Sequence, residues 1–305
     1  MRVKLADRIG FCFGVKRAIN TAEEALKKKE RASSLGSIIH NTQVVEALAR
    51  KGLKIIKDID EAQGAPVLIS SHGAPPEVFN RIKEKGLDII DTTCPFVLHA
   101  QRLASQMVEE GYTIVIVGEE THPEVKAIAG FSLNKAIVVK DKSDPKLKDL
   151  SGGKKVAIIS QTTQRINNFL DVVGAIVACG PKEVRVFNTI CSDTGRRQKA
   201  AADLAKTVDI MIVIGGRHSA NTNRLLEVCG NFTDSYLVET DEDVRSEWFR
   251  GKRCAGIASG ASTPDWVIEK VVRKIEKFKA QGAKRKVKSK NPMERGCVVN
   301  DKRRG

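Results

Sequence analysis

The chain has 305 residues, 41% of them hydrophobic and 29% charged, which is the composition of a folded globular protein and not of a disordered or fibrous one. Its length allows two or three domains, and no apolar run approaches the roughly 18 residues that a membrane-spanning helix needs. Residues 1–8 carry charges where a signal peptide needs an apolar stretch, so we expect a cytoplasmic protein with no membrane partner.

Nearly half of the net charge of +15 lies at the C-terminal end of the chain. Residues 282–305 contain nine Lys or Arg residues against two acidic residues. This balance is compatible with a nucleic-acid partner, but the segment has no aromatic side chain on which a base could stack. We therefore expect a basic, disordered tail and no nucleic-acid partner.

Short apolar runs alternate with amphipathic segments along the chain. Runs at residues 67–69, 113–117, 156–159 and 209–214 are typical of buried strands, whereas the segments 97–110 and 197–206 have the 3.6-residue periodicity of helices. Continuous apolar strands that alternate with helices predict an α/β fold, with mostly parallel sheets covered on both faces.

Three cysteines, Cys12, Cys94 and Cys191, share one local context, between an extended segment and a predicted helix. Pro95 suits the first turn of the helix after Cys94, and Ser192 or Asp193 can cap the helix after Cys191. Because the carboxyl ends of parallel strands are where open α/β sheets bind ligands, we expect the three cysteines to converge at a common centre.

The spacing of these cysteines predicts how the chain divides. Cys94 lies 82 residues after Cys12, and Cys191 lies 97 residues after Cys94, so each interval is about the length of one small α/β unit. We predict three pseudo-repeated units, and each of them delivers one cysteine to the centre. Their expected bounds are residues 1–93, 94–190 and 191–281, with residues 282–305 as the tail.

Three thiols at helix starts can hold an iron–sulphur cluster. The helix N-terminus is expected to lower the thiol pKa, which favours the thiolate that a metal requires. Three cysteine ligands leave one iron of a four-iron cluster open, as a Lewis acid for a substrate oxygen. A single buried cysteine is more often a small hydrophobic residue, which is how we interpret Cys179, Cys229 and Cys254, while Cys297 belongs to the tail.

Polar side chains also follow the predicted strands. Three of the five histidines, His40, His72 and His122, come after extended segments, as do the hydroxyl- and amide-rich loops at residues 161–164, 215–221 and 259–262. Hydroxyls, amides and free backbone N–H groups suit an anion, and histidines can add positive charge, so a diphosphate is the expected ligand. Simple capping of the following helices explains each single loop about equally well.

Two familiar cofactor motifs are absent from the sequence. It has no G-x-x-x-x-G-K-[ST] segment, which argues against a P-loop nucleoside triphosphatase. It also has no G-x-G-x-x-G after the first strand, so nothing in the sequence supports a nicotinamide cofactor. Any electrons are therefore expected from a protein donor.

Together the motifs of the three predicted units resemble one known family. They are Gly10-Phe11-Cys12-Phe13-Gly14-Val15, Ser71-His72-Gly73, Asp91-Thr92-Thr93-Cys94-Pro95, His122-Pro123-Glu124-Val125, Gln161-Thr162-Thr163 and Gly260-Ala261-Ser262. In this order, over residues 1–278, they resemble the LytB/IspH family of 4-hydroxy-3-methylbut-2-enyl diphosphate reductases.

This resemblance implies the last step of the non-mevalonate isoprenoid pathway. In that reaction an allylic alcohol diphosphate loses its hydroxyl group and gains two electrons, which gives isopentenyl and dimethylallyl diphosphates. By the same resemblance Cys12, Cys94 and Cys191 hold one [4Fe-4S] cluster per subunit, whose open iron takes the hydroxyl oxygen. A ferredoxin or flavodoxin type of protein is the implied electron donor.

The resemblance also implies roles for the polar residues. The positions that match diphosphate-binding residues of the family are His40, His72, Ser219, Asn221 and Ser262. His122 lies in the same pocket, Glu124 looks like the proton source, and Thr162 relays a proton to the substrate hydroxyl. Ala220 replaces a serine that is frequent in the family, so this position can contribute only through its backbone.

Two other function classes stay open at this point. A non-redox [4Fe-4S] enzyme of the quinolinate synthase type also resembles three α/β units around three cysteines, but it needs no stoichiometric reductant. A cluster-containing or basic binding protein, which senses redox state or grips nucleic acid through its tail, is the third possibility.

Overall fold

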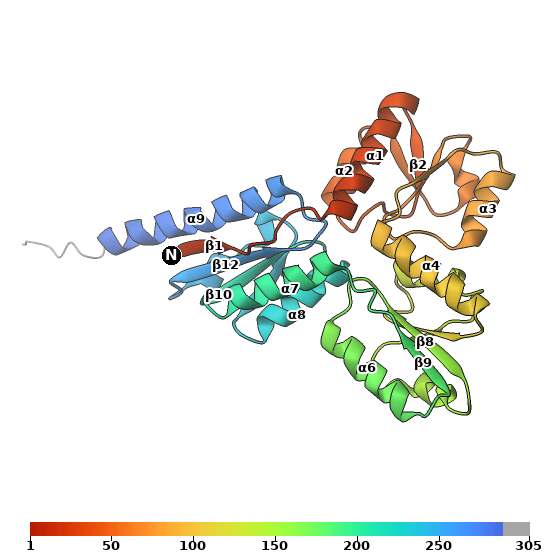
Figure 1. Cartoon of the computed structure of the whole chain (residues 1–305). Coiled ribbons are helices and arrows are strands. Elements are labelled where there is room, and N and C mark those ends of the chain that lie inside the picture. The colour runs from red at the N-terminus through yellow and green to blue at the C-terminus, as the bar shows by residue number, and fades with distance from the viewer. Residues whose placement is uncertain (289–305) are drawn as a thin grey trace, which may run out of the picture.

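The computed structural model describes residues 1–288, and it describes side chains through residue 278. In this part of the chain three separate four-stranded sheets form, and every strand pairing in them is parallel. Figure 1 shows three lobes, each a sheet with helices against it, that meet at the centre of the molecule. The predicted α/β fold of three small units is confirmed.

The first sheet has the strand order β3-β2-β4-β5. Its strands are β2 (Ala32–Leu35), β3 (Leu53–Ile56), β4 (Val67–Ile69) and β5 (Ile89–Asp91). The helices of this unit are α1 (Phe13–Lys29), α2 (Thr42–Ala49), the 3-10 helix η1 (Ile59–Ala62) and α3 (Pro76–Glu84). The apolar stripe of α1, with Ala18, Ala22 and Leu26, packs into a core that includes Leu68 of β4.

The second sheet has the strand order β7-β6-β8-β9. Its strands are β6 (Thr113–Val117), β7 (Ile137–Val139), β8 (Lys155–Ser160) and β9 (Glu183–Val186). The helices are α4 (Pro95–Glu109), α5 (Pro123–Gly130), the 3-10 helix η2 (Pro145–Leu150) and α6 (Ile166–Ala178). Side chains of β6 and β8 alternate between two cores, one against α4 and α5 and the other against α6.

The third sheet has the strand order β1-β12-β10-β11. Its strands are β1 (Arg2–Leu5), β10 (Ile210–Ile214), β11 (Ser235–Val238) and β12 (Cys254–Ser259). The helices are α7 (Ser192–Ala205), α8 (Ala220–Gly230), the 3-10 helices η3 (Asp241–Asp243) and η4 (Ser246–Phe249), and α9 (Asp265–Lys288). All residues of β10 and β12 are buried, as their apolar sequences require.

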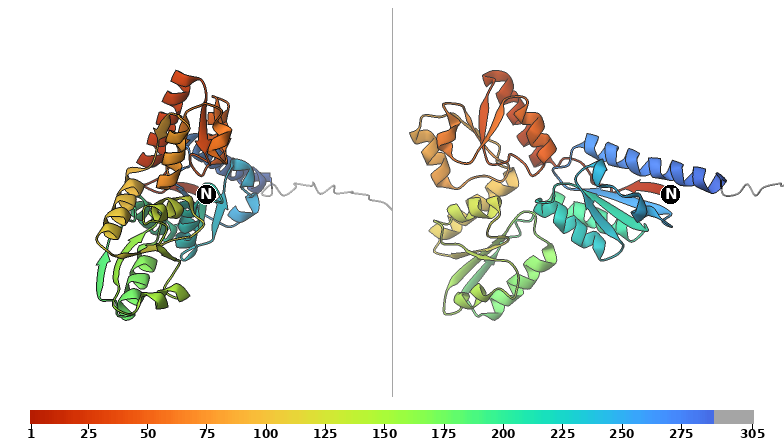
Figure 2. Two further views of the ribbon diagram at one scale, coloured as in Figure 1. Left: turned by 90° about the vertical axis from the view of Figure 1, so that its right-hand side faces the viewer. Right: turned by 180° about the vertical axis from the view of Figure 1, so that it is seen from behind.

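In each sheet, one edge strand is followed directly by the first helix of the next unit. β5 and β9 are edge strands of the first and second sheets, and β1 has the same place in the third. The chain then enters α1 after β1, α4 after β5 and α7 after β9. These helices pack against the next sheet: α1 contacts β2 and β5, α4 contacts β6 and β8, and α7 contacts β12. The three units are therefore joined in a ring of three crossovers (Figure 2).

The position of β1 corrects one sequence-based expectation. The first unit was expected to span residues 1–93, but β1 pairs with β12 in the third sheet. The physical reason is that β1 pairs with backbone groups at the edge of β12 that would otherwise lack partners. The local sequence of β1 does not indicate which sheet offers such an edge. The boundaries expected at residues 93 and 190 stay predictions; they fall between β5 and α4 and between β9 and α7.

The C-terminal end also differs from its expectation. A disordered tail was predicted from residue 282, whereas α9 extends to Lys288. Five of the seven residues from 282 to 288 are good helix formers, Ala, Lys and Arg, which explains why the helix continues beyond the core. Residues 289–305, the rest of the predicted tail, lie outside the described residues.

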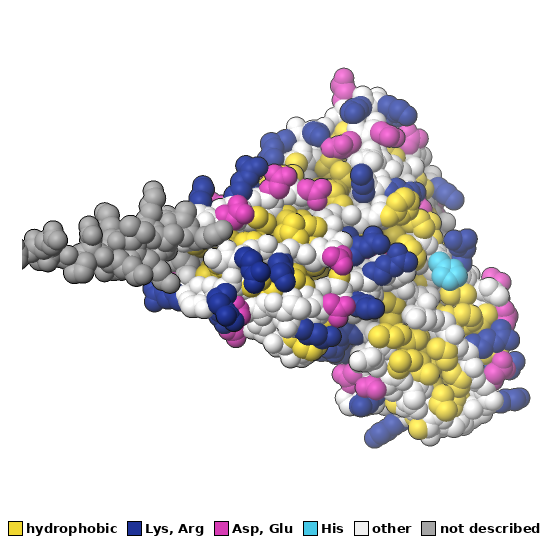
Figure 3. Space-filling model, turned by 60° about the vertical axis from the view of Figure 1, so that its left-hand side comes forward, with side chains coloured by type: hydrophobic (Ala, Val, Ile, Leu, Met, Phe, Trp, Pro, Cys, Tyr) yellow, Lys and Arg dark blue, Asp and Glu magenta, His cyan; other side chains and the backbone are white. Residues whose placement is uncertain are grey.

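The surface carries one apolar helix face. Ile166, Leu170 and Val177 of α6 are each about half exposed, and Figure 3 shows hydrophobic side chains gathered over this part of the second unit. Within residues 1–288, no helix is both long and apolar enough to cross a membrane.

Candidate functional site

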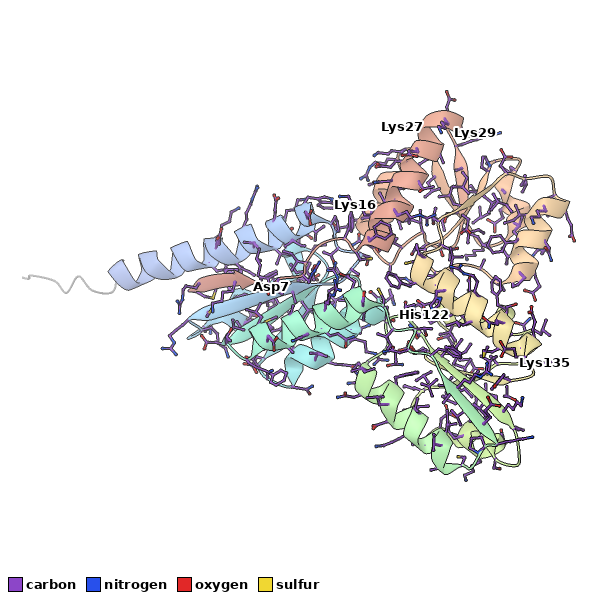
Figure 4. All side chains as sticks on the ribbon, viewed as in Figure 1. Asp7, Lys16, Lys27, Lys29, His122 and Lys135 are labelled. Carbon is purple, nitrogen blue, oxygen red and sulfur yellow. The ribbon has the colours of Figure 1, made fainter. Side chains whose placement is uncertain are left out.

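A cavity lies at the centre of the molecule, where the three units meet. Its walls include all of the residues for which the sequence predicts a site role, namely Cys12, His40, His72, Cys94, His122, Glu124, Thr162, Cys191, Ser219, Ala220, Asn221 and Ser262. Figure 4 shows His122 at this junction, whereas Lys27 and Lys29 lie at the outer end of α1. The predicted convergence is therefore a feature of the structure, while the role of each residue stays a prediction.

Parallel sheet geometry explains the convergence. Each of these residues follows the carboxyl end of a strand or begins the helix after it, as His72 does after β4 and Thr162 after β8. In a parallel sheet the carboxyl ends of all strands lie at one edge, and all three sheets direct that edge toward the centre. Segments that are distant in sequence therefore meet in one cavity.

The three cysteines occupy the same structural position, the N-cap of a crossover helix. Cys12 caps α1, Cys94 caps α4 and Cys191 caps α7, all with extended backbone. The Cys12 Sγ accepts a hydrogen bond from the backbone N–H of Val15 at 3.4 Å, whereas the other two thiols make no capping bond. The three thiols line the cavity, and none is in a disulfide.

Gly14 leaves space beside the thiols of Cys94 and Cys12 because it has no side chain. At Gly14, in the first turn of α1, an added Cβ would lie 2.6 Å from the Cys94 Sγ and 4.0 Å from the Cys12 Sγ. The first distance is well inside van der Waals contact, so no larger residue fits without displacing the Cys94 thiol. The backbone of α1 thus forms one wall of the space between two thiols.

Burial changes the charge state expected for these thiols. The helix N-terminus was expected to lower their pKa, but desolvation raises the pKa of Cys12 and raises that of Cys94 to about 11. The hydrogen bond from Val15 opposes the shift at Cys12 without reversing it. Because metal binding needs thiolates, any metal that binds here must displace these protons, which makes its affinity dependent on pH.

The donor set fits a cluster better than a single ion. Among the described residues, no three His, Cys, Asp or Glu side chains are placed to hold one metal ion. The ligands of an iron–sulphur cluster bind different irons, so they need not meet at one point. Three thiols around a shared cavity, with the backbone of Gly14 as one wall, therefore fit a cluster.

Three histidine rings form a second group in the cavity. The ring centroids of His40 and His72 are 4.3 Å apart, and that of His122 is 5.6 Å from each. Desolvation is the main cause that lowers the pKa of all three, to about 4 for His122, and positive charge on a neighbouring histidine, His218 in the case of His40, adds to it. At pH 7 they are thus neutral until an anion binds, which corrects the expectation that they add charge by themselves.

The start of α8 completes a polar wall of the cavity. Ser219 caps this helix, and the adjacent first turn brings Ala220 and Asn221 to the cavity. First-turn N–H groups have no partner within a helix. Both amide atoms of the Asn221 side chain are buried without a hydrogen-bond partner, as is the His40 Nε2. Such unpaired buried groups are costly, so they favour a polar ligand that bonds to them.

Ser262 ties two of these segments together. Its Oγ donates a hydrogen bond to the backbone carbonyl of His40 at 3.1 Å, so the loop after β12 holds the loop before α2. A side chain at Gly216 could not be accommodated there, because its Cβ would lie 2.8 Å from the same carbonyl oxygen. Close backbone contact of the first and third units therefore fixes the position of His40.

Glu124 is a buried carboxylate in the cavity wall. Thr162, which follows β8, binds both of its oxygens. Its Oε1 accepts the backbone N–H of Thr162 at 2.5 Å, and its Oε2 accepts the Thr162 hydroxyl at 2.8 Å. The ring of His122 caps α5 by accepting the Glu124 N–H at 3.2 Å. Desolvation raises the pKa of Glu124 to about 7, and the two bonds from Thr162 only partly oppose it. The carboxyl group can therefore hold or release a proton near neutral pH.

Sequence reasoning missed a charged pair at the cavity. Asp193 lines the cavity and pairs with Arg197, which is only 3% exposed. The available signal was their i,i+4 spacing at the start of the helix that follows Cys191. Sequence alone gave no reason to expect that the arginine is buried.

The Glu124–Thr162 contact yields a direct prediction. Because the Thr162 hydroxyl stabilises the charged carboxylate, Thr162→Val is expected to raise the pKa of Glu124 further above 7, while Thr162→Ser leaves it near 7. The measurement is an infrared titration of the protonated carboxyl band, with Glu124→Gln to assign it. An equal titration midpoint in the Val variant would contradict the assigned hydrogen bond.

Comparison with known proteins agrees with this geometry. The LytB protein family matches residues 3–276. The 4-hydroxy-3-methylbut-2-enyl diphosphate reductase of Campylobacter hominis is 44% identical over 278 residues, which cover 90% of this chain and 98% of that protein. The reductase of the same name from Nautilia profundicola is 42% identical and covered over its whole length, with 91% of this chain.

Solved structures agree as well. One described as (E)-4-hydroxy-3-methyl-but-2-enyl diphosphate reductase, the terminal enzyme of the non-mevalonate pathway, is 42% identical, with a TM-score of 0.66 over 91% of this chain and all of that one. The E-1-hydroxy-2-methyl-but-2-enyl-4-diphosphate reductase of Plasmodium falciparum is 27% identical, with a TM-score of 0.85 over 89% and 87% of the two chains. From the family match, these relatives and the shared fold, the chain belongs to the LytB protein family.

Proposed function

We propose that the protein reduces (E)-4-hydroxy-3-methylbut-2-enyl diphosphate to isopentenyl and dimethylallyl diphosphates, the last step of the non-mevalonate pathway. The carbon–oxygen bond of the allylic alcohol breaks, two electrons and two protons are taken up, and one water is released. The observation that carries the proposal is the cavity itself, in which three thiols, an anion-binding wall and a carboxyl group with a pKa of about 7 lie together.

We infer that Cys12, Cys94 and Cys191 hold one [4Fe-4S] cluster per subunit. Each thiol comes from a different crossover, and Gly14 keeps the space between two of them open. When bound, such a cluster supplies single electrons and one iron without a protein ligand, which acts as a Lewis acid. The helix N-termini at the three thiols stabilise the negative charge of the bound thiolates.

The diphosphate is assigned to the wall formed by the histidines and the start of α8. His40 and His72 offer ring N–H donors, Asn221 offers an unpaired amide, and Ser219 and Ser262 offer hydroxyls. A bound diphosphate brings negative charge beside His40 and His72, which opposes the desolvation and the repulsion that lower their pKa, so we expect proton uptake on binding. Ala220 takes part only through its backbone N–H.

Glu124 is assigned as the proton source for the departing hydroxyl group. Its pKa of about 7 lets the carboxyl group carry a proton at neutral pH, and Thr162, whose hydroxyl it binds, also lines the cavity. A proton can pass from Glu124 through this hydroxyl to the substrate oxygen, which then leaves as water. His122 holds the first turn of α5, and with it Glu124, in place.

The electrons are assigned to a ferredoxin or flavodoxin type of donor, since no nicotinamide-binding fingerprint exists in the sequence. This donor and the cytoplasmic location stay predictions. The non-redox enzyme of the quinolinate synthase type gains no support from the comparisons, whose relatives carry the reductase name. A requirement for stoichiometric reductant separates these two activities.

The first test is a cluster analysis of the full chain. After anaerobic purification or reconstitution we expect four irons per chain, and Mössbauer spectra in which one iron site changes when the allylic diphosphate is added. Protein that stays free of iron and sulphide after reconstitution would mean that the three cysteines do not form a cluster site, and the proposed function would fall.

A second prediction concerns the space beside Cys94. Gly14→Ala is expected to lower the iron and sulphide bound per chain after reconstitution, because its Cβ displaces the Cys94 thiol. The matched control is Gly174→Ala in α6, where an added Cβ meets nothing within 4 Å. The control is expected to bind iron normally and to gain about 1 kcal/mol of helix stability. Equal iron and sulphide content in both variants would contradict the inference that Gly14 keeps the space beside the Cys94 thiol free for the cluster.

A third prediction tests Glu124. Glu124→Gln is expected to keep the cluster and substrate affinity but to lose turnover by about 100-fold or more, the usual contribution of a general acid. In the unaltered protein, turnover is expected to fall by about tenfold per pH unit above about pH 7, since the carboxyl group loses its proton there. Glu120→Gln, an exposed residue of the loop before α5, is the control. Near-normal turnover of Glu124→Gln would remove Glu124 from the reaction.

A further inference from the structure

Helix α7 carries a charged pair that the proposed function does not use. The Nε of Arg197 donates to the Oδ2 of Asp193 at 2.5 Å, with the two side chains 4% and 27% exposed. A buried guanidinium is costly to desolvate, and a single carboxylate compensates this cost only in part. A buried charge at the start of a crossover helix therefore calls for an explanation.

One donor group of the Arg197 guanidinium has no hydrogen-bond partner. The NH1 group of Arg197 is buried and has no hydrogen-bond partner, and the same is true of the Nε2 of the next residue, Gln198. Buried donors without partners are rare in folded proteins, since each costs free energy. The interior beside α7 is therefore electropositive and ready for an acceptor.

The pair lies within electrostatic reach of the cysteines. Asp193 lines the cavity two residues after Cys191, whereas Arg197 lies one helical turn further and does not itself line it. Asp193 shares the cavity wall with Cys12, Cys94 and Cys191, and the Arg197 guanidinium contacts the Asp193 carboxylate at 2.5 Å. The guanidinium therefore lies one contact behind the wall that carries the three thiols.

We propose that Arg197 sets the reduction potential of the iron–sulphur cluster, with Asp193 positioning its guanidinium and offsetting part of its charge. This rests on the proposed function, because it requires the cluster. Reduction adds negative charge, which a nearby buried cation stabilises, so Arg197 raises the potential and Asp193 lowers it. Arg197 is a positioning and tuning residue, since it does not line the cavity where the substrate is expected.

The test is a potentiometric titration of the clustered protein, followed by electron paramagnetic resonance. Arg197→Gln is expected to reduce the equilibrium constant for one-electron reduction by about tenfold, which corresponds to about 59 mV. Arg197→Lys is expected to restore most of it, because the charge returns. Asp193→Asn is expected to shift the potential in the opposite direction, upward. A merely structural disturbance gives no reason for opposite shifts from the two halves of one pair.

The matched control is an ion pair with the same spacing far from the cavity. Arg273 and Glu269 pair at i,i+4 on α9 with a 3.2 Å contact, and their side chains are 74% and 63% exposed. Water screens charges at such a site, so Arg273→Gln and Glu269→Gln are expected to leave the potential unchanged.

The outcomes separate this inference from the proposed function. A clustered, active protein whose potential is the same in Arg197→Gln and Asp193→Asn would overturn the inference alone. A higher KM for the diphosphate with an unchanged potential would do the same and assign Arg197 to anion binding. If Arg197→Gln does not fold or load, the opposite shift in Asp193→Asn still decides. Unaltered protein that takes up no cluster contradicts the proposed function itself.

Discussion

The structure depends on three crossovers, at each of which the chain leaves the edge of one parallel sheet and begins a helix against the next. A cysteine caps the helix at every crossover, so the same connections that join the units also bring the three thiols together. The N-terminal strand β1 closes the ring by pairing in the last sheet. Because the centre is made of the connections themselves, a displacement of one unit would move a thiol, a strand end or both.

Desolvation dominates the chemistry of the cavity. It raises the pKa of Cys12, Cys94 and Glu124 and lowers that of His40, His72 and His122, so these groups approach neutrality at pH 7. Under the proposed function, charge enters with the ligands: the cluster replaces thiol protons, and the diphosphate favours protonated histidines. Glu124, with a pKa of about 7, is the group in this set that can exchange a proton at neutral pH without a ligand.

The pair of Asp193 and Arg197 is the exception to this neutrality. It keeps a fixed cation inside α7, and burial protects that cation from screening by water. A histidine can change its protonation when a ligand binds, whereas a guanidinium cannot lose its charge. The cavity thus combines groups that can change protonation with a buried cation behind its wall, which Asp193 partly offsets.

The sequence by itself determined the fold class of three small α/β units, and it predicted residues that the structure brings to one cavity. It could do so because continuous apolar strands, helix starts and the polar residues after strand ends are local patterns, and the motifs around Cys12, Cys94 and Cys191 are specific. Only the tertiary structure decided that β1 joins the third sheet, that burial raises the pKa of the Cys12 and Cys94 thiols and lowers that of the three histidines, and that Arg197 is buried. Strand partners and desolvation depend on what other segments cover, and that arrangement exists only once the chain has folded.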